Sequence, residues 1–262
     1  MKVAYLWFLL LLVQNLTAQR LATNKEYMGP SRCWGLSFTP AIVTKATVTG
    51  DKDIYHVKTA PQFGGEILIN YNYRFERNYA LIVGGGLNFL GFNFDYNIPK
   101  EMFSPPTEAN ITTNSAASRE MNIINFRVPV ELERIFNDRK DDEWLIRAGA
   151  SLLFSVQQPE QTSDAIYYSN GGPKTFLDRY QSNNNNGKMW FGFQLLAGHR
   201  WLLKKNAFQA GLKVHYCPFK FVDGEYHFNV GNQPEHQGRY GLTGSYIGLS
   251  FEYILKKSPV QF

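Results

Sequence analysis

Eight stretches of this chain alternate large apolar residues with polar or small ones, and the connections between these stretches alternate between short and long. The clearest stretch is Trp144–Phe154, in which the even positions are apolar while Arg147, Gly149 and Ser151 take odd positions. Successive side chains of a β-strand point to opposite faces, so this alternation predicts strands with one apolar and one polar face. Eight such strands predict an all-β fold, an eight-stranded antiparallel up-and-down transmembrane β-barrel with long extracellular loops.

The predicted strands are Cys33–Thr44, Gln62–Phe75, Tyr79–Tyr96, Glu120–Ile135, Trp144–Val156, Lys188–Leu202, Ala207–Pro218 and Tyr240–Leu255. Their second, fourth and sixth connections are short, which is typical of periplasmic turns, and the others are long. We therefore expect both ends of the mature chain on the periplasmic side and the long loop Gln157–Gly187 on the outside. Pro129 and the change of parity near Leu90-Gly91 each predict a β-bulge.

The first residues predict export. Lys2 precedes the apolar run Tyr5–Val13, which is too short to span a bilayer as a helix, and Ala18 offers a small residue at a cleavage point. We expect residues 1–18 to be a removed signal peptide, 19–32 a short periplasmic lead, 33–257 the outer-membrane barrel and 258–262 a C-terminal tail. Cys33 and Cys217 are too few for a disulfide framework and are expected as free thiols.

The charge and hydropathy exclude two classes of protein. The formal charge of +5 is small and the basic residues are dispersed, whereas nucleic-acid binding needs a clustered basic face. The slightly polar mean hydropathy argues against a bundle of membrane helices, but it fits a barrel with a polar interior. The expected partners are outer-membrane lipid and other envelope proteins, and no nucleic acid.

The polar faces of the predicted strands carry charged residues that would point into the barrel. An eight-stranded barrel is just wide enough inside for its own side chains, and isolated charges there are costly, so we expect these charges to pair. The expected ionic network contains Glu66, Arg127, Glu131, Arg147, Lys213 and Glu252, and the same faces also hold Arg74, Glu133, Arg200 and His215. A turn centred near Arg139 would place Glu131 opposite Arg147. The network is interpreted either as a plug that fixes the strand register or as the lining of a narrow pore or proton path.

Aromatic residues near the short-turn ends of the strands predict a membrane boundary. Tyr and Trp favour the headgroup level because one end of each side chain is apolar and the other is wet. The predicted aromatic girdle consists of Trp34, Tyr73, Tyr79, Trp144, Trp201 and Tyr253. The alternative is a soluble sandwich whose core aromatics fall at these positions by chance.

The five histidines give no metal-ligand spacing, because no H-x-x-H or H-x-x-x-H pair occurs. His227 and His236 would share a site only if the last long loop brought them together, with Glu225 or Glu235 nearby. We expect no metal, no cofactor and no catalytic residue.

The strand Ile123–Glu131, its charged turn and the following Arg147-Ala148-Gly149-Ala150 resemble the outer-membrane β-barrel family that includes PorT-like and OmpA-like eight-stranded proteins. In PorT-like proteins a fourth strand with an I-P-L-like motif precedes a glycine-rich fifth strand. The resemblance implies a barrel over essentially the whole mature chain. It also implies, for some members, a role in type IX protein secretion.

Several functions remain open at this point. The first is a non-enzymatic barrel that serves as a structural anchor, displays surface loops, or assists a secretion or envelope machine. The second is a lipid A-modifying hydrolase or acyltransferase, which needs a base within hydrogen-bond reach of a hydroxyl and an orienting carboxylate. His215 lies on an inward face, but no Ser/His/acid signature flanks it. The third is a narrow channel. A soluble lipocalin-like binder would place apolar residues inside and charges outside, the opposite of the predicted faces.

Overall fold

The structure is a computed structural model of the chain, and it describes residues 31–112, 121–137, 142–155, 160–168, 171–182, 189–203, 206–220 and 222–256. The predicted signal peptide (1–18), nearly all of the predicted periplasmic lead and the predicted tail (258–262) lie outside these residues. No helix in the described ranges is both long and apolar enough to cross a membrane.

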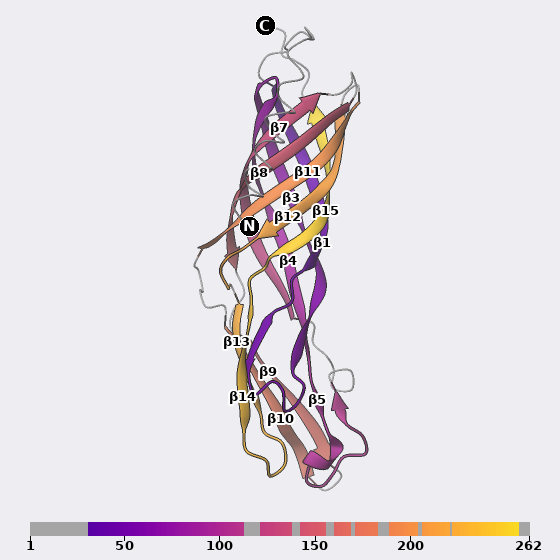
Figure 1. Cartoon of the computed structure of the whole chain (residues 1–262), viewed down its shortest axis with the longest axis vertical. Coiled ribbons are helices and arrows are strands. Elements are labelled where there is room, and N and C mark those ends of the chain that lie inside the picture. The colour runs from indigo at the N-terminus through magenta and orange to yellow at the C-terminus, as the bar shows by residue number, and fades with distance from the viewer. Residues whose placement is uncertain are drawn as a thin grey trace, which may run out of the picture.

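Eight antiparallel strands form a closed barrel, as predicted, in the order β1-β15-β12-β11-β8-β7-β4-β3 (Figure 1). The strands are β1 (Ser31–Val43), β3 (Lys58–Glu76), β4 (Tyr79–Asp95), β7 (Met121–Asn137), β8 (Asp142–Ser155), β11 (Met189–Leu202), β12 (Asn206–Tyr216) and β15 (Tyr246–Lys256). The predicted bounds agree to within a few residues, except that Tyr240–Leu242 belong to a separate strand. Cys33 pairs with Lys256 and Asn72, so the described chain starts and ends at the short-turn end of the barrel.

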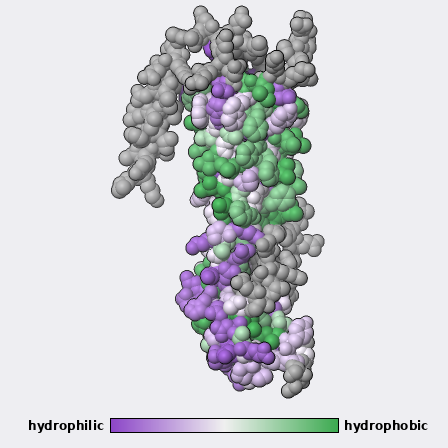
Figure 2. Space-filling model, turned by 90° about the vertical axis from the view of Figure 1, so that its right-hand side faces the viewer, coloured by the Kyte–Doolittle hydropathy of each residue, from purple (hydrophilic) through white to green (hydrophobic). Residues whose placement is uncertain are grey.

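Side chains on each barrel strand alternate between the outer surface and the interior. On β1, Trp34 is 56% exposed and Leu36 and Phe38 are similarly exposed, while Gly35 and Ser37 between them are buried. The other barrel strands follow the same rule, and Figure 2 shows the resulting apolar band on one side of the barrel. An apolar exterior around a polar interior is the arrangement that a bilayer requires of a spanning barrel.

The long connections contain regular structure of their own, which corrects the prediction that they are loops. Five further strands form an antiparallel sheet in the order β2-β14-β13-β10-β9 at the end of the barrel opposite the short turns (Figure 1). They are β2 (Thr47–Gly50), β9 (Glu160–Tyr168), β10 (Gly171–Ser182), β13 (Val222–Phe228) and β14 (His236–Leu242). The predicted loop Gln157–Gly187 therefore contains the β9–β10 hairpin. A two-stranded ladder, β5 (Asn97–Ile98) with β6 (Ile111–Thr112), and a 3-10 turn, η1 (Lys100–Met102), complete what we call the β-extension.

The β-extension has an aromatic core that continues from the barrel. On β4 the even positions face inward throughout, but their chemistry changes from Gly86 and Asn88 to the buried Leu90, Phe92 and Phe94. These side chains pack with others from the second sheet, namely Phe176, Tyr226, Phe228 and Tyr240. The burial of many aromatic side chains explains why these strands are ordered away from the membrane.

Neither predicted bulge is present where the sequence placed it. The register of β4 against β7 continues unshifted through Leu90-Gly91, and the irregularity lies in the partner strand β3, between Pro61 and Gly65. Both ladders of β7 also keep their register through Pro129. The parity change seen in the sequence is instead the change from a polar interior to an apolar core.

Candidate functional site in the barrel interior

The inward faces of the barrel strands bring five cations and five carboxylates into one enclosed space. The cations are Arg74, Arg127, Arg147, Arg200 and Lys213, and the carboxylates are Glu66, Glu131, Glu133, Glu143 and Glu252. All except Arg74, which lies at the short-turn end, are buried. The alternation of each strand places them here, because an inward position on one strand lies beside inward positions on its two neighbours.

Arg147 of β8 is shared by three carboxylates. Its guanidinium lies 2.8 Å from Glu133, 2.9 Å from Glu252 and 3.4 Å from Glu131. The residue directly opposite Arg147 on β7 is Glu133, whereas Glu131 is opposite Gly149. The predicted register of this pair is therefore wrong by two residues, because the turn is centred nearer to residue 140 than to Arg139. Glu131 nevertheless reaches Arg147 from the same face.

Toward the short-turn end, the ion pairs continue through Arg200. This residue bonds Glu133 at 2.7 Å and Glu143 at 3.1 Å, and Glu143 also bonds Arg74 at 3.0 Å. The amide oxygen of Gln209 accepts hydrogen bonds from Arg200 and Arg147. Arg147 and Arg200 thus share two acceptors, Glu133 and Gln209.

Toward the β-extension, the ion pairs converge on Glu66 of β3, which is 0% exposed. Its carboxylate accepts from Lys213 at 2.6 Å, from the hydroxyl of Tyr246 at 2.8 Å, and from Arg127. Lys213 also lies 3.9 Å from Glu131. This last contact joins the cluster around Glu66 to the cluster around Arg147.

One continuous chain of ion pairs therefore runs through the barrel interior, and its formal charges cancel. Its members touch one another across the lumen, since Arg147 on β8 reaches Glu252 on β15 and Lys213 on β12 reaches Glu66 on β3. Buried charges are tolerated when they are paired and hydrogen-bonded, and removal of one partner is costly. We call this chain the ionic network.

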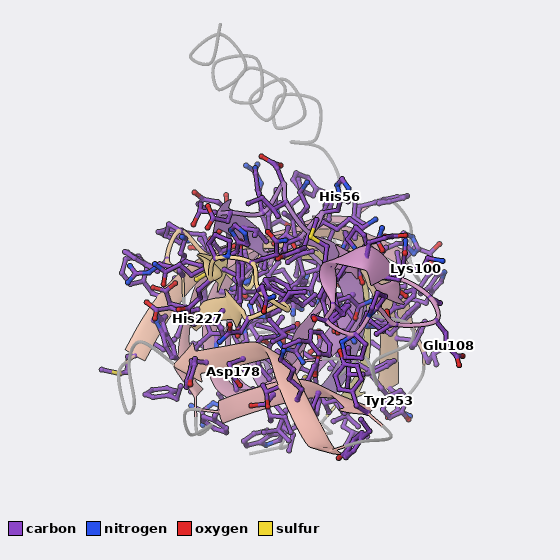
Figure 3. All side chains as sticks on the ribbon, turned by 90° about the horizontal axis from the view of Figure 1, so that it is seen from below. His56, Lys100, Glu108, Asp178, His227 and Tyr253 are labelled. Atoms are coloured by element: carbon purple, nitrogen blue, oxygen red, sulfur yellow. The ribbon has the colours of Figure 1, made fainter. Side chains whose placement is uncertain are left out.

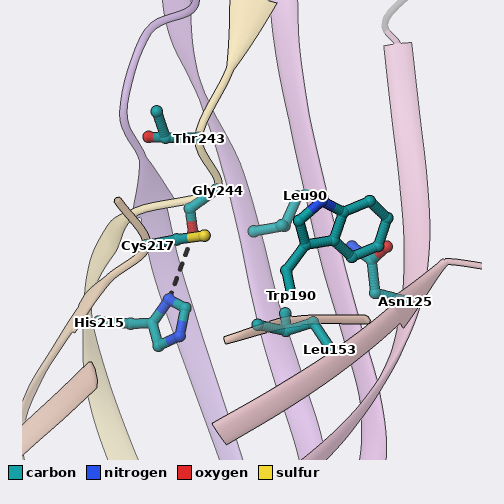
Figure 4. A pocket seen from close by; sticks show the side chains of 8 residues that line it. All are labelled: Leu90, Asn125, Leu153, Trp190, His215, Cys217, Thr243 and Gly244. Atoms are coloured by element: carbon teal, nitrogen blue, oxygen red, sulfur yellow. Dashed lines mark hydrogen bonds between the residues drawn. The ribbon is translucent and has the colours of Figure 1, made fainter. Parts of the chain in front are cut away.

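A small pocket lies where the polar interior meets the aromatic core (Figure 4). It is lined by Leu90, Asn125, Leu153, Trp190, His215, Cys217, Thr243 and Gly244. His215 points one ring nitrogen at the carbonyl oxygen of Gly244, at 3.3 Å, and the other at the hydroxyl of Ser151, also at 3.3 Å. The free space is about 10 Å³, which is room for one water molecule but not for a lipid chain.

The predicted aromatic girdle residues all lie near the short-turn end. Trp34, Trp144, Trp201 and Tyr253 are exposed on the lipid-facing side, and Tyr73 and Tyr79 are half-buried there. Neighbouring rings contact one another around the rim, for example Trp201 with Phe208 at 5.7 Å and Phe75 with Tyr79 at 6.4 Å.

The histidines of the β-extension do not come together. His227 bonds Glu235 at 2.8 Å and packs on Tyr180, whereas His236 lies beside Asp51 and contacts the ring of Tyr55. His236 is opposite Phe228 in the β13–β14 ladder, so His227 is on the other face of that sheet. Figure 3 shows His56 well apart from His227. Within the described ranges no three His, Cys, Asp or Glu residues are grouped as metal ligands.

Two cations, two acids and one hydroxyl of the interior were outside the predicted ionic network. The cations are Arg74 and Arg200, which the sequence placed on inward faces. Glu133 has the inward parity, and Glu143 lies just before the predicted start of its strand at Trp144. Tyr246 shares the parity of Ser250 and Glu252, so the alternation indicated an inward side chain, but only the structure shows its bond to Glu66. Both cysteines are free thiols, as predicted.

The closed barrel, its apolar band and its charged interior define the class of this protein: it is an outer-membrane β-barrel. No family model matches the chain, and no curated protein matches its sequence, so the PorT-like resemblance stays a prediction. Solved structures are similar at low identity. Neisserial surface protein A (TM-score 0.40, 11% identity) is matched over 87% of this chain and 99% of its own. OprG from Pseudomonas aeruginosa (0.43, 8%) is matched over 88% and 98%, and Ail of Yersinia pestis (0.34, 9%) over 86% and 99%. The assignment to the class rests on the strand order and the facing of side chains, not on these likenesses.

Proposed function

We propose that this protein is a closed, non-enzymatic outer-membrane barrel that carries the β-extension on the outer surface of the cell, where it presents a binding surface to other molecules. The observation that carries the proposal is the ionic network, because side chains that touch across the lumen leave no continuous path for ions. The interior then serves to fix the barrel, and contacts with partners fall to the β-extension.

The orientation follows from the connections. Outer-membrane barrels place short turns in the periplasm and long connections outside, and the five-stranded sheet of the β-extension lies in the long connections. Its exterior is largely hydrophilic (Figure 2), as expected of a part that stands in water. This architecture supports two roles. The barrel would anchor the surface of the β-extension, or the protein would assist a secretion or envelope machine.

A lipid A-modifying enzyme has one observation in its favour, the hydrogen bond between Ser151 and His215. Three features count against it. Both residues are buried inside the barrel, the second nitrogen of His215 faces the carbonyl of Gly244 rather than a carboxylate, and the adjacent pocket holds about one water. An acyl chain in the bilayer has no route to this hydroxyl through the described residues.

The closed barrel is tested by electrical recording from the purified full-length protein in a planar bilayer. We expect no steady conductance from the unmutated protein. In a parallel experiment with lipid vesicles, protection of the barrel strands from protease shows that the protein has inserted. A stable, ion-selective current from the inserted protein would contradict the plug and establish the narrow channel instead.

The binding surface is tested by co-purification from cell envelopes in mild detergent. The unmutated protein is compared with a variant in which the exposed Tyr167 of β9 and Tyr180 of β10 are changed to Ser. We expect envelope proteins to co-purify with the unmutated chain and to be lost from the variant. Equal recovery of envelope proteins with the unmutated chain and the variant would show that this face of the β-extension is not the binding surface.

A further inference from the structure

A row of three rings follows the short-turn rim on the adjacent strands β3 and β4, between Arg32 on β1 and Arg134 on β7. Tyr73 contacts Phe75 at 6.5 Å, and Phe75 stacks on Tyr79 at 6.4 Å. An arginine lies at each end of the row. Arg32 is placed over the ring of Tyr73 at 5.8 Å, and Arg134 is placed over Tyr79 at 5.8 Å and over Phe136 at 5.1 Å.

Both arginines stand on the lipid-facing side of the barrel. Arg32 shares its parity with the exposed Trp34 and Leu36 on β1, and Arg134 shares its parity with the exposed Leu132 on β7. Neither guanidinium forms an ion pair with a carboxylate among the described residues, unlike the arginines of the interior. Their ring contacts fix the plane of each guanidinium, and neither donates a hydrogen bond to another side chain among the described residues, so the N–H groups are suited to donate to a ligand.

We propose that Arg32 and Arg134 are two binding sites for the phosphate groups of phospholipids in the leaflet at the short-turn end. The girdle sets the level, because Tyr and Trp lie at the headgroups. A guanidinium is a planar donor that suits phosphate and that stacks on aromatic faces, so the rings hold each donor where a headgroup phosphate passes. The two arginines are three strand spacings apart, about 15 Å, so each binds a separate headgroup.

The rest of the rim gives an internal comparison. On β8, β11 and β12 the ring contacts run from Trp144 through His199 and Trp201 to Phe208, and no described arginine or lysine is stacked on them. The sites are therefore a property of one side of the barrel, and the aromatic girdle as a whole does not create them.

The test counts the lipids that stay bound to the purified full-length protein. The protein in non-ionic detergent is titrated with short-chain phosphatidylglycerol, and retained lipids are counted by native mass spectrometry. Arg32→Gln and Arg134→Gln are each expected to lower retention about five-fold, the equivalent of about 1 kcal/mol per cation at an anionic surface. The matched control is Arg239→Gln on the β-extension, which should retain lipid like the unmutated protein. The shift of the folded barrel on an unheated gel shows that each variant is folded.

Two further arms identify the ligand. Phosphatidylcholine, whose headgroup has no net charge, should be retained less than phosphatidylglycerol, and an excess of inorganic phosphate should not displace the lipid. Unchanged retention by the Arg32→Gln, Arg134→Gln double variant would overturn the proposal. Displacement by inorganic phosphate would also overturn it, because the rim would then be a site for free anions.

Discussion

At the scale of single residues, the interior charges act as a group and not as separate pairs. Arg147 serves three carboxylates, and for Glu252 it is the only ion-pair partner among the described residues. A buried carboxylate that loses its cation keeps the cost of desolvation without the compensating attraction. We therefore expect the free energy of unfolding of the barrel to depend on whether the charges of the ionic network stay balanced.

Arg147→Ala is expected to lower the free energy of unfolding by about 3–5 kcal/mol, because it leaves buried carboxylates unpaired. Equilibrium unfolding in urea, from lipid vesicles, measures this loss. The control is Arg239→Ala, which breaks a surface pair with Glu225 and should cost less than about 1 kcal/mol. Equal losses from the two variants would refute a tightly coupled interior.

The double variant Arg147→Leu, Glu252→Leu removes one charge of each sign. We expect it to cost less than Arg147→Leu alone, since Glu133 keeps Arg200 and Glu131 keeps Lys213. The double variant Arg147→Leu, Glu131→Leu should lose more unfolding free energy than Arg147→Leu, Glu252→Leu, because Glu252 is then left without its cation. The same unfolding assay ranks the three proteins, and the reverse order of the two double variants would show that Arg147 does not hold Glu252.

The outward face gives a prediction of the opposite kind. Leu249 of β15 is 56% exposed and lies on the lipid-facing side. Leu249→Arg is expected to destabilise the barrel in vesicles by about 2–4 kcal/mol, the cost of a cation near the middle of the bilayer. Leu249→Phe is the matched control and should be nearly neutral. No difference between these two variants would mean that Leu249 does not face lipid.

At the scale of strands, alternation predicted the barrel well because each barrel strand has two faces of opposite chemistry over many residues. The register between strands was harder to predict. It depends on the centre of each turn, so Glu133 took the place predicted for Glu131. The strands of the β-extension were missed because their apolar residues do not alternate regularly. In β10, for example, the buried Phe176 and Leu177 are neighbours at a register shift. Tyr226 and Phe228 reveal their common face only when β4 and β14 are folded against them.

The β-extension should unfold separately from the barrel. Phe94 is 1% exposed and contacts Tyr226 and Tyr240 at 5.5 and 5.6 Å. Phe94→Ala is expected to weaken the aromatic core by about 3–5 kcal/mol, so that protease cuts β13 or β10 while the barrel keeps its folded mobility on an unheated gel. The exposed Tyr167→Ala serves as the control and should leave protection unchanged. Loss of the folded barrel in the Phe94 variant would show that the two parts unfold as one.

The hydroxyl of Tyr96 is tied to this core. Burial and the neighbouring Asp164 raise the pKa of Tyr96 well above its usual value, so the hydroxyl stays protonated and donates to Asp164 at 2.8 Å. Burial and the nearby Asp51 and Asp53 raise the pKa of Tyr226 to about 12. Neither of these two tyrosines therefore ionises near neutral pH.

At the scale of the whole molecule, the orientation in the membrane can be read with cysteine labels. In a Cys33→Ser, Cys217→Ser background, Lys174→Cys on β10 should react in intact cells with a maleimide that cannot cross the membrane. Asn78→Cys, in the short turn between β3 and β4, should react only after the outer membrane is permeabilised. Both positions are exposed, so a difference between them reports on sidedness. The reverse pattern would invert the proposed orientation.

The strands β3 and β4 pass without interruption from the apolar band into the β-extension, over Lys58–Glu76 and Tyr79–Asp95. A force applied at the far tip of the β-extension is therefore carried along covalent backbone into the wall of the barrel, through β4, which keeps its register against β7, and through β3, which has one irregularity between Pro61 and Gly65. Inside the wall, the pull acts along the strands and loads many inter-strand hydrogen bonds in shear at once, instead of opening them one after another. We therefore expect the protein to be stiff along its long axis. In the proposed orientation, this stiffness suits it to hold a tethered load under tension at the cell surface.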